Sequence, residues 1–183
     1  MNNPFNLKHS LLVATLLVSP LAQAATTSQA DYATGKSRIS ADFKADKTAC
    51  SSLAGNAKDI CVEEAIAKEK VARAELDAGH TGTAADRNKV LVVKAESGYA
   101  VAKEKCDDLA GNAKDVCVKE AKAVEVKALT DAKVGKQIGE ATASAAEDKR
   151  DAEYKVAAEK CDAMSGDAKA GCLSAAKAKF GKS

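Results

Sequence analysis

The stretch that decides the fold reads CSSLAGNAKDIC at Cys50–Cys61 and CDDLAGNAKDVC at Cys106–Cys117. A third, looser copy, CDAMSGDAKAGC, occupies Cys161–Cys172. The leading cysteines lie 56 and then 55 residues apart. A fixed period of this length is typical of stacked supersecondary units. The sequence therefore predicts three related units, each with two cysteines placed symmetrically about its centre.

The centre of each copy carries a signal for a chain reversal. A glycine there can adopt the left-handed conformation that ends a helix. The polar residue that follows can cap the first turn of a new helix. The predicted turn residues are Gly55, Asn56, Gly111, Asn112, Gly166 and Asp167. We therefore expect two antiparallel helices to meet at each glycine, since one uninterrupted helix would hold paired cysteines about 16 Å apart, beyond disulfide reach.

The symmetry of the cysteines about each turn predicts three local disulfides. Six cysteines allow fifteen pairings, and only the symmetry selects one of them. The predicted bridges are Cys50–Cys61, Cys106–Cys117 and Cys161–Cys172. Each bridge closes a loop of about a dozen residues and is expected to contribute about 2 to 3 kcal/mol.

Helix-face spacing extends the pattern outward from each leading cysteine. An aromatic residue stands seven positions before it, and a leucine or methionine stands three positions after it. Both spacings place side chains on one face of a helix, so we expect each set to form one apolar stripe. The residues of the three stripes are Phe43, Tyr99 and Tyr154 before the cysteines, and Leu53, Leu109 and Met164 after them.

Composition favours an all-α fold with a thin core. Charged residues make up 30% of the chain and aromatic residues 3%, and alanine is far more frequent than any large apolar residue, as is typical of helices. We expect three tandem disulfide-stapled antiparallel hairpins, elongated or loosely bundled, at about 28–78, 84–134 and 140–180. The expected helices cover about 28–53, 57–78, 84–110, 113–134, 140–164 and 168–180. Residues 79–83 are predicted as a loop, Thr83 with Asp86 resembles a capping box, and Gly135–Gly139 is expected to produce a kink or a short break.

Residues 1–24 have the layout of a signal peptide. An apolar run from Leu11 to Val18 is followed by Pro20 and by Ala22-Gln23-Ala24, which suits a signal peptidase. The run is too short to cross about 30 Å of hydrocarbon as a helix. We expect cleavage after Ala24 and a soluble, periplasmic mature chain, residues 25–183, in a compartment where disulfides persist.

The sequence offers little for catalysis. His80 is the one histidine after residue 24, and no serine or cysteine has the neighbours that would activate it. We expect His80 to lie in a solvent-exposed loop, and we predict no catalytic, cofactor-binding or metal site. The balance of 28 Lys and Arg against 26 Asp and Glu argues against a nucleic-acid partner.

The cysteine copies, together with VAKEKC before Cys106 and VAAEKC before Cys161, resemble a group of small exported proteobacterial proteins rich in Ala, Lys and Glu. Some members of this group carry a label as TolA-like cell-envelope proteins. The resemblance covers the chain after the signal peptide and carries over no functional residue. With the composition, it favours a non-enzymatic periplasmic interaction or envelope-support protein that contacts a protein partner or a second copy of itself. The alternative is a periplasmic stress protein with chaperone-like or weak metal-binding activity.

Overall fold

The computed structural model describes residues 27–182, so the segment assigned to a signal peptide lies outside the described residues. Within them the protein is all-α, as predicted, with five helices where six were expected. The helices are α1 (Gln29–Cys50), α2 (Gly55–Thr81), α3 (Ala84–Cys106), α4 (Gly111–Cys161) and α5 (Gly166–Phe180).

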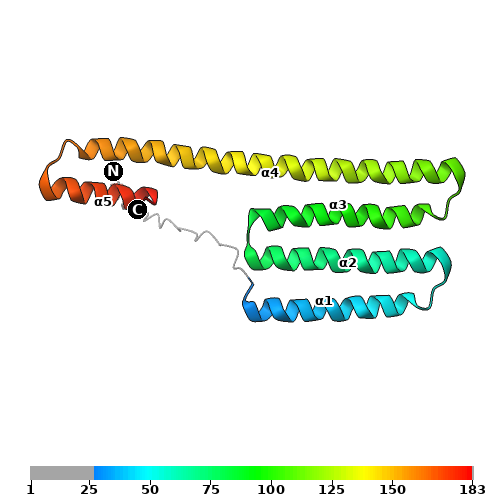
Figure 1. The fold of residues 1–183 in the computed structure, drawn as a ribbon. Helices are drawn as coiled ribbons and strands as arrows, with labels where there is room; N and C mark the ends of the chain where they lie inside the picture. The colour runs from blue at the N-terminus through cyan, green and yellow to red at the C-terminus, as the bar shows by residue number, and fades with distance from the viewer. Residues whose placement is uncertain (1–26, 183) are drawn as a thin grey trace, which may run out of the picture.

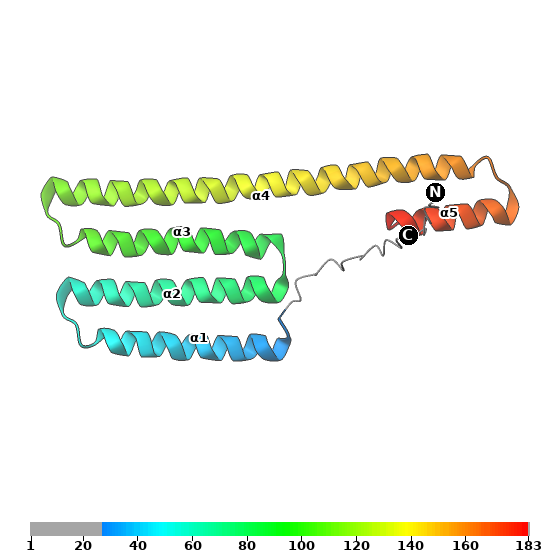
Figure 2. The same cartoon turned by 180° about the vertical axis from the view of Figure 1, so that it is seen from behind.

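The helices form a single layer. In the part of the chain that the structure describes, each helix contacts only the helices before and after it in sequence. Helices α1, α2, α3 and the first half of α4 lie side by side and antiparallel (Figures 1 and 2). Helix α5 packs against the second half of α4, on the same side of α4 as α3. The result is an elongated array of stapled hairpins without a central core.

Two helix starts have side-chain caps. The Ser28 hydroxyl accepts a hydrogen bond from the backbone N–H of Asp31 at 3.1 Å, and that of Thr83 accepts one from Asp86 at 3.0 Å. The Asp86 carboxylate accepts hydrogen bonds from the hydroxyls of Thr81 and Thr83, and these lower its pKa. The predicted cap at Thr83 is therefore confirmed, but α2 continues to Thr81 and shortens the predicted loop.

The stapled turns differ in detail from the prediction. All three turn glycines have positive φ, from +54° to +57°, so the left-handed conformation is confirmed. Each preceding helix ends at its cysteine, and each glycine instead begins the next helix. The predicted caps are wrong, because the N-cap positions are Ala54, Ala110 and Ser165, without a side-chain hydrogen bond.

Helix α4 runs unbroken for 51 residues through the predicted break at Gly135–Gly139. Hairpins 84–134 and 140–180 therefore share one helix. Each glycine costs a helix about 1 kcal/mol relative to alanine, but neither Gly135 nor Gly139 has the positive φ that ends a helix. Alanine-rich helix on both sides of the two glycines favours a continuous helical backbone through them.

Few side chains are buried in this layer. The buried apolar residues are Ile39, Cys50, Ala65, Ala74, Cys106, Ala132, Cys161 and Ala176. The predicted stripes are wrong at one position of each copy, because Leu53, Leu109 and Met164 are 42 to 47% exposed. They lie beyond the cysteine that ends each helix and so leave the helix face on which the prediction placed them.

The same substitution at two glycines should have opposite effects. Gly111→Ala forces a Cβ into a left-handed backbone and is expected to lower the free energy of unfolding by about 1 kcal/mol. Gly135→Ala, inside α4 with open space around the added Cβ, should raise it by about 0.5 to 1 kcal/mol. Urea unfolding followed by circular dichroism measures the change in the free energy of unfolding for both variants. Changes of the same sign would contradict the conformations assigned to the two glycines.

Candidate interaction surface

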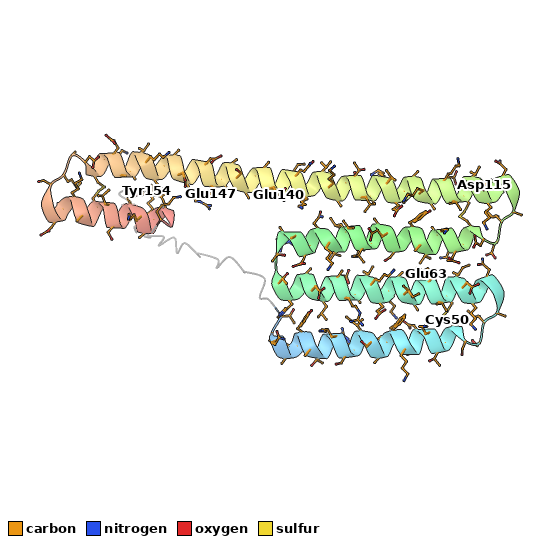
Figure 3. The ribbon with its side chains drawn as sticks, viewed as in Figure 1. Cys50, Glu63, Asp115, Glu140, Glu147 and Tyr154 are labelled. Atoms are coloured by element: carbon orange, nitrogen blue, oxygen red, sulfur yellow. A yellow bond between two sulfur atoms is a disulfide. The ribbon has the colours of Figure 1, made fainter. Side chains whose placement is uncertain are left out.

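All six cysteines form the predicted disulfides. The bridges are Cys50–Cys61, Cys106–Cys117 and Cys161–Cys172, with Cα–Cα distances of 5.6, 5.7 and 5.7 Å. The leading cysteine of each pair is at most 1% exposed. Figure 3 places Cys50 where α1 turns into α2. The bridges lie at the turn end of each hairpin and hold its two helices in contact there.

An ion pair that the sequence interpretation missed supports two of the three turns. Lys114 Nζ lies 2.9 Å from Asp107, and Lys169 Nζ lies 2.9 Å from Asp162. The hydrogen bond that Lys114 donates to Asp107 raises the pKa of Lys114. The signal was an aspartate directly after the cysteine and a lysine three residues after the turn glycine. The first copy has Ser51 in place of the aspartate.

The six predicted turn residues all lie at the stapled ends of the hairpins. Among the described residues, Asn56 is the one turn residue whose side chain makes a tertiary hydrogen bond. Its Nδ2 donates to the backbone carbonyl of Glu104 at 3.2 Å. This bond joins the first hairpin to the end of α3. The turn residues therefore shape and connect the hairpins, and the structure does not gather them into one site.

His80 has a structural role at the open end of the first hairpin. Its ring stacks on Tyr32 with centroids 4.3 Å apart, and its Nδ1 lies 2.9 Å from the carbonyl oxygen of Thr27. The Tyr32 hydroxyl donates to Asp77 at 2.7 Å, and this bond raises the tyrosine pKa. The expected solvent-exposed loop histidine is therefore wrong, because α2 extends through His80 and brings it against α1.

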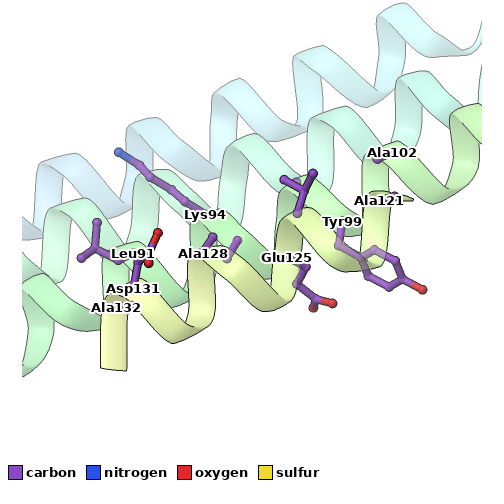
Figure 4. Close-up of a pocket in the computed structure, with 12 residues that line it drawn as sticks. Leu91, Lys94, Tyr99, Ala102, Ala121, Glu125, Ala128, Asp131 and Ala132 are labelled. Atoms are coloured by element: carbon purple, nitrogen blue, oxygen red, sulfur yellow. The ribbon is translucent and has the colours of Figure 1, made fainter. Parts of the chain in front are cut away.

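An apolar groove with a volume of about 590 Å³ lies between α3 and α4 (Figure 4). A wider hollow of about 830 Å³ lies between α4 and α5. Small side chains dominate the lining of the groove. The groove residues are Leu91, Lys94, Ala95, Gly98, Tyr99 and Ala102 from α3, and Ala121, Val124, Glu125, Ala128, Asp131 and Ala132 from α4. Leu91 is 53% exposed and Val124 71% exposed, so the groove presents two large apolar side chains beside alanine and glycine.

Polar contacts fix one end of the groove. Glu125 is 7% exposed, and its carboxylate accepts a hydrogen bond from Lys122. The Lys122 ammonium lies 4.8 Å from the centroid of the Tyr99 ring. The bond to Glu125 raises the pKa of Lys122. These contacts hold α3 and α4 in register where the alanine lining contributes little burial.

The groove continues toward the start of α3. A second hollow of about 560 Å³ shares Leu91 and Ala132 with it and extends past Gly135 and Gly139. The two hollows together follow most of the length of α3. A surface of this shape can accommodate an extended apolar segment, such as the face of a helix.

Residues 27–182 have the features of neither a metal site nor a membrane span. No group of three or more His, Cys, Asp or Glu side chains is placed to hold a metal ion there. None of the five helices combines the length and the hydropathy that a membrane crossing requires.

The comparisons with known proteins add no family. No protein-family model matches the chain, and no curated protein and no solved structure is significantly similar to it. The resemblance to TolA-like envelope proteins stays a prediction.

Proposed function

We propose that this protein is a non-enzymatic interaction or support protein of the periplasm, and that its α3–α4 groove binds a helical segment of a protein partner in the cell envelope. The groove carries the proposal. Its apolar lining is exposed although the chain has few large apolar residues to bury. Exposed apolar surface of this kind is typical of protein contacts.

The shape of the groove selects the partner's chemistry. Gly98, Ala95 and Ala102 on one side leave room for large side chains from outside. A partner helix with apolar residues at spacings of three and four would place them between Leu91 and Val124. Lys94 and Asp131 line the edge of the groove, where they pair with Glu75 and Lys127. The polar flanks of the partner would therefore meet paired charges of both signs. The partner we expect is therefore an amphipathic protein helix.

Three disulfides support the proposed compartment, since such bridges persist in exported proteins and are rare in the cytosol. The resemblance to exported envelope proteins and the signal-like sequence of residues 1–24 point the same way. We propose a periplasmic location on these grounds. Mass spectrometry of the N-terminal peptide from a periplasmic extract tests this location. The peptide should begin at Ala25, as cleavage after Ala24 predicts, and a peptide that retains Met1 would contradict it.

Filling the groove should abolish partner binding. Gly98→Leu puts a large side chain on the groove surface, where an added Cβ meets nothing within 4 Å. With a photo-crosslinking amino acid in place of Leu91, cells should yield a specific crosslinked envelope protein. Gly98→Leu is expected to reduce that adduct at least tenfold, because the inserted side chain occupies the partner's position.

The matched control is Gly171→Leu, on exposed α5 with the same open space around the added Cβ. It should leave the adduct unchanged, and circular dichroism should show equal helix content in both variants. An adduct that survives Gly98→Leu, or that Gly171→Leu removes equally, would rule out the groove as the binding site.

A further inference from the structure

Two ion pairs connect α2 to α3. Glu75 lies 2.6 Å from Lys94 Nζ, and Glu64 lies 2.7 Å from Lys105 Nζ. Each pair joins an acidic residue of α2 to a basic residue of α3 across antiparallel helices. The two pairs lie eleven residues apart on both helices, so both are compatible with the same register of α2 against α3.

The sequence repeats both pairs one unit later. Shifting Glu64 and Glu75 by the first period of 56 residues gives Glu120 and Asp131. Shifting Lys94 and Lys105 by the second period of 55 gives Lys149 and Lys160. All four charges are therefore present in α4, in the positions that would join an equivalent pair of antiparallel helices.

These residues cannot meet within one chain as it is folded. Because α4 is continuous, Asp131 and Lys149 lie about 27 Å apart along its axis, and Glu120 and Lys160 about 60 Å apart. All four are exposed. Asp131 pairs with Lys127 at 2.6 Å and Lys149 with Glu153 at 3.9 Å, both one turn away on α4 itself. Among the described residues, none of the four charges pairs with a residue of α3 or α5.

The four charges share one side of α4 with exposed apolar residues. Taking about 100° per residue, the set falls within an arc of about 80°, centred roughly 120° from buried Ala132, which faces α3. We call this set the open stripe: Val116, Glu120, Asp131, Val134, Ile138, Lys149, Val156 and Lys160. Its four apolar members are 44 to 61% exposed. Asp131 also lines the groove against α3, and Val156 and Lys160 also line a hollow against α5. The open stripe therefore lies on a flank of α4 beside both helices, which pack on one side of α4 (Figures 1 and 2).

We propose that the open stripe binds a second copy of this chain, with the two α4 helices antiparallel. Glu120 then pairs with Lys160 of the second copy, and Asp131 with Lys149. Each pair forms twice, and all four are centred on position 140 of α4, as a twofold axis requires. The interface reproduces between chains the packing that α2 and α3 make within one chain, and it covers the exposed apolar members of the open stripe.

A hairpin of α4 folded back on itself would make the same contacts, but the turn signals are missing. The α2–α3 turn uses left-handed Gly82, the Thr83 cap and the Asp86 carboxylate. The residues 55 positions later are Gln137, Ile138 and Ala141, which supply none of these features. Helix α4 therefore carries the charges of a hairpin interface but has no turn to form the hairpin. We assign the partner charges of that interface to a second chain.

Charge reversal with complementation tests the dimer. The full chain, expressed with its export signal and purified with its disulfides intact, should show a dimeric mass by light scattering. The variant Lys149→Glu with Lys160→Glu, and separately Glu120→Lys with Asp131→Lys, should each raise the dissociation constant about a hundredfold, because four ion pairs become like-charge contacts. An equimolar mixture of the two variants should restore the dimer, since every contact is then between opposite charges.

The control is Lys133→Glu with Lys155→Glu, which makes the same change of charge at exposed positions of α4 outside the open stripe. It should leave the dimer intact. A monomeric parent chain at high micromolar concentration would overturn the proposal. So would variants that keep the parent mass, or two variants that stay monomeric when mixed, the result expected of an intrachain hairpin.

Discussion

Replacing all six cysteines by alanine is expected to unfold most of the protein at 37 °C. Each bridge closes a loop of about a dozen residues and contributes about 2 to 3 kcal/mol. The three bridges lie at separate turns, so their contributions should be nearly additive. Their total of about 6 to 9 kcal/mol is comparable with the whole stability of a typical domain. The single layer has few buried apolar side chains to replace that contribution.

Urea unfolding at 25 °C, followed by circular dichroism at 222 nm, measures this loss. The matched series removes one bridge at a time, for example Cys106→Ala with Cys117→Ala, and each member should lose only about 2 to 3 kcal/mol. If the variant without cysteines kept a free energy of unfolding within about 1 kcal/mol of the parent, the bridges would be incidental and the thin layer would be stable by its packing alone.

A charge at the α3–α4 contact should have the next largest effect. Ala132 is 2% exposed, on the same face of α4 as nearly buried Glu125. Ala132→Glu would place a second carboxylate there without a partner and would force α3 away from α4. We expect the free energy of unfolding to fall by about 3 kcal/mol.

Ala141→Glu is the matched control, since Ala141 lies on the same helix in a fully exposed stretch. It should change the free energy of unfolding by less than about 0.5 kcal/mol. Chemical denaturation of both variants gives the comparison. Equal stabilities would mean that Ala132 does not face α3 in solution.

The cysteine copies could be interpreted from sequence because their evidence is local. Symmetry about Gly55, Gly111 and Gly166 determines which sulfurs can meet, and this holds whatever the rest of the chain does. The capping polar residues were predicted wrongly because the helices end at the cysteines and restart at the glycines. A difference of three residues in a helix end also moves Leu53 from a predicted stripe to the surface.

The continuity of α4 was harder to predict because it depends on a small difference of free energies. Two glycines cost about 1 kcal/mol each, and only the missing cap and the missing left-handed glycine decide against a break. The groove between α3 and α4 depends on how two helices pack side by side, and no single segment of the sequence predicts that packing. The open stripe could have been found from the repeat, by comparing Glu64 and Lys105 with Glu120 and Lys160, but its meaning depends on α4 being unbroken.

The continuity of α4 is the central claim, since the single layer, the extended surface and the open stripe all depend on it. Pulsed electron spin resonance between spin-labelled amino acids at positions 119 and 159 tests it directly, in samples diluted with unlabelled chain so that only distances within one chain are recorded. Forty residues of unbroken helix predict a separation of about 60 Å. A separation near 10 Å, the spacing of two packed helices, would show that the chain folds back at Gly135–Gly139 and would contradict the account.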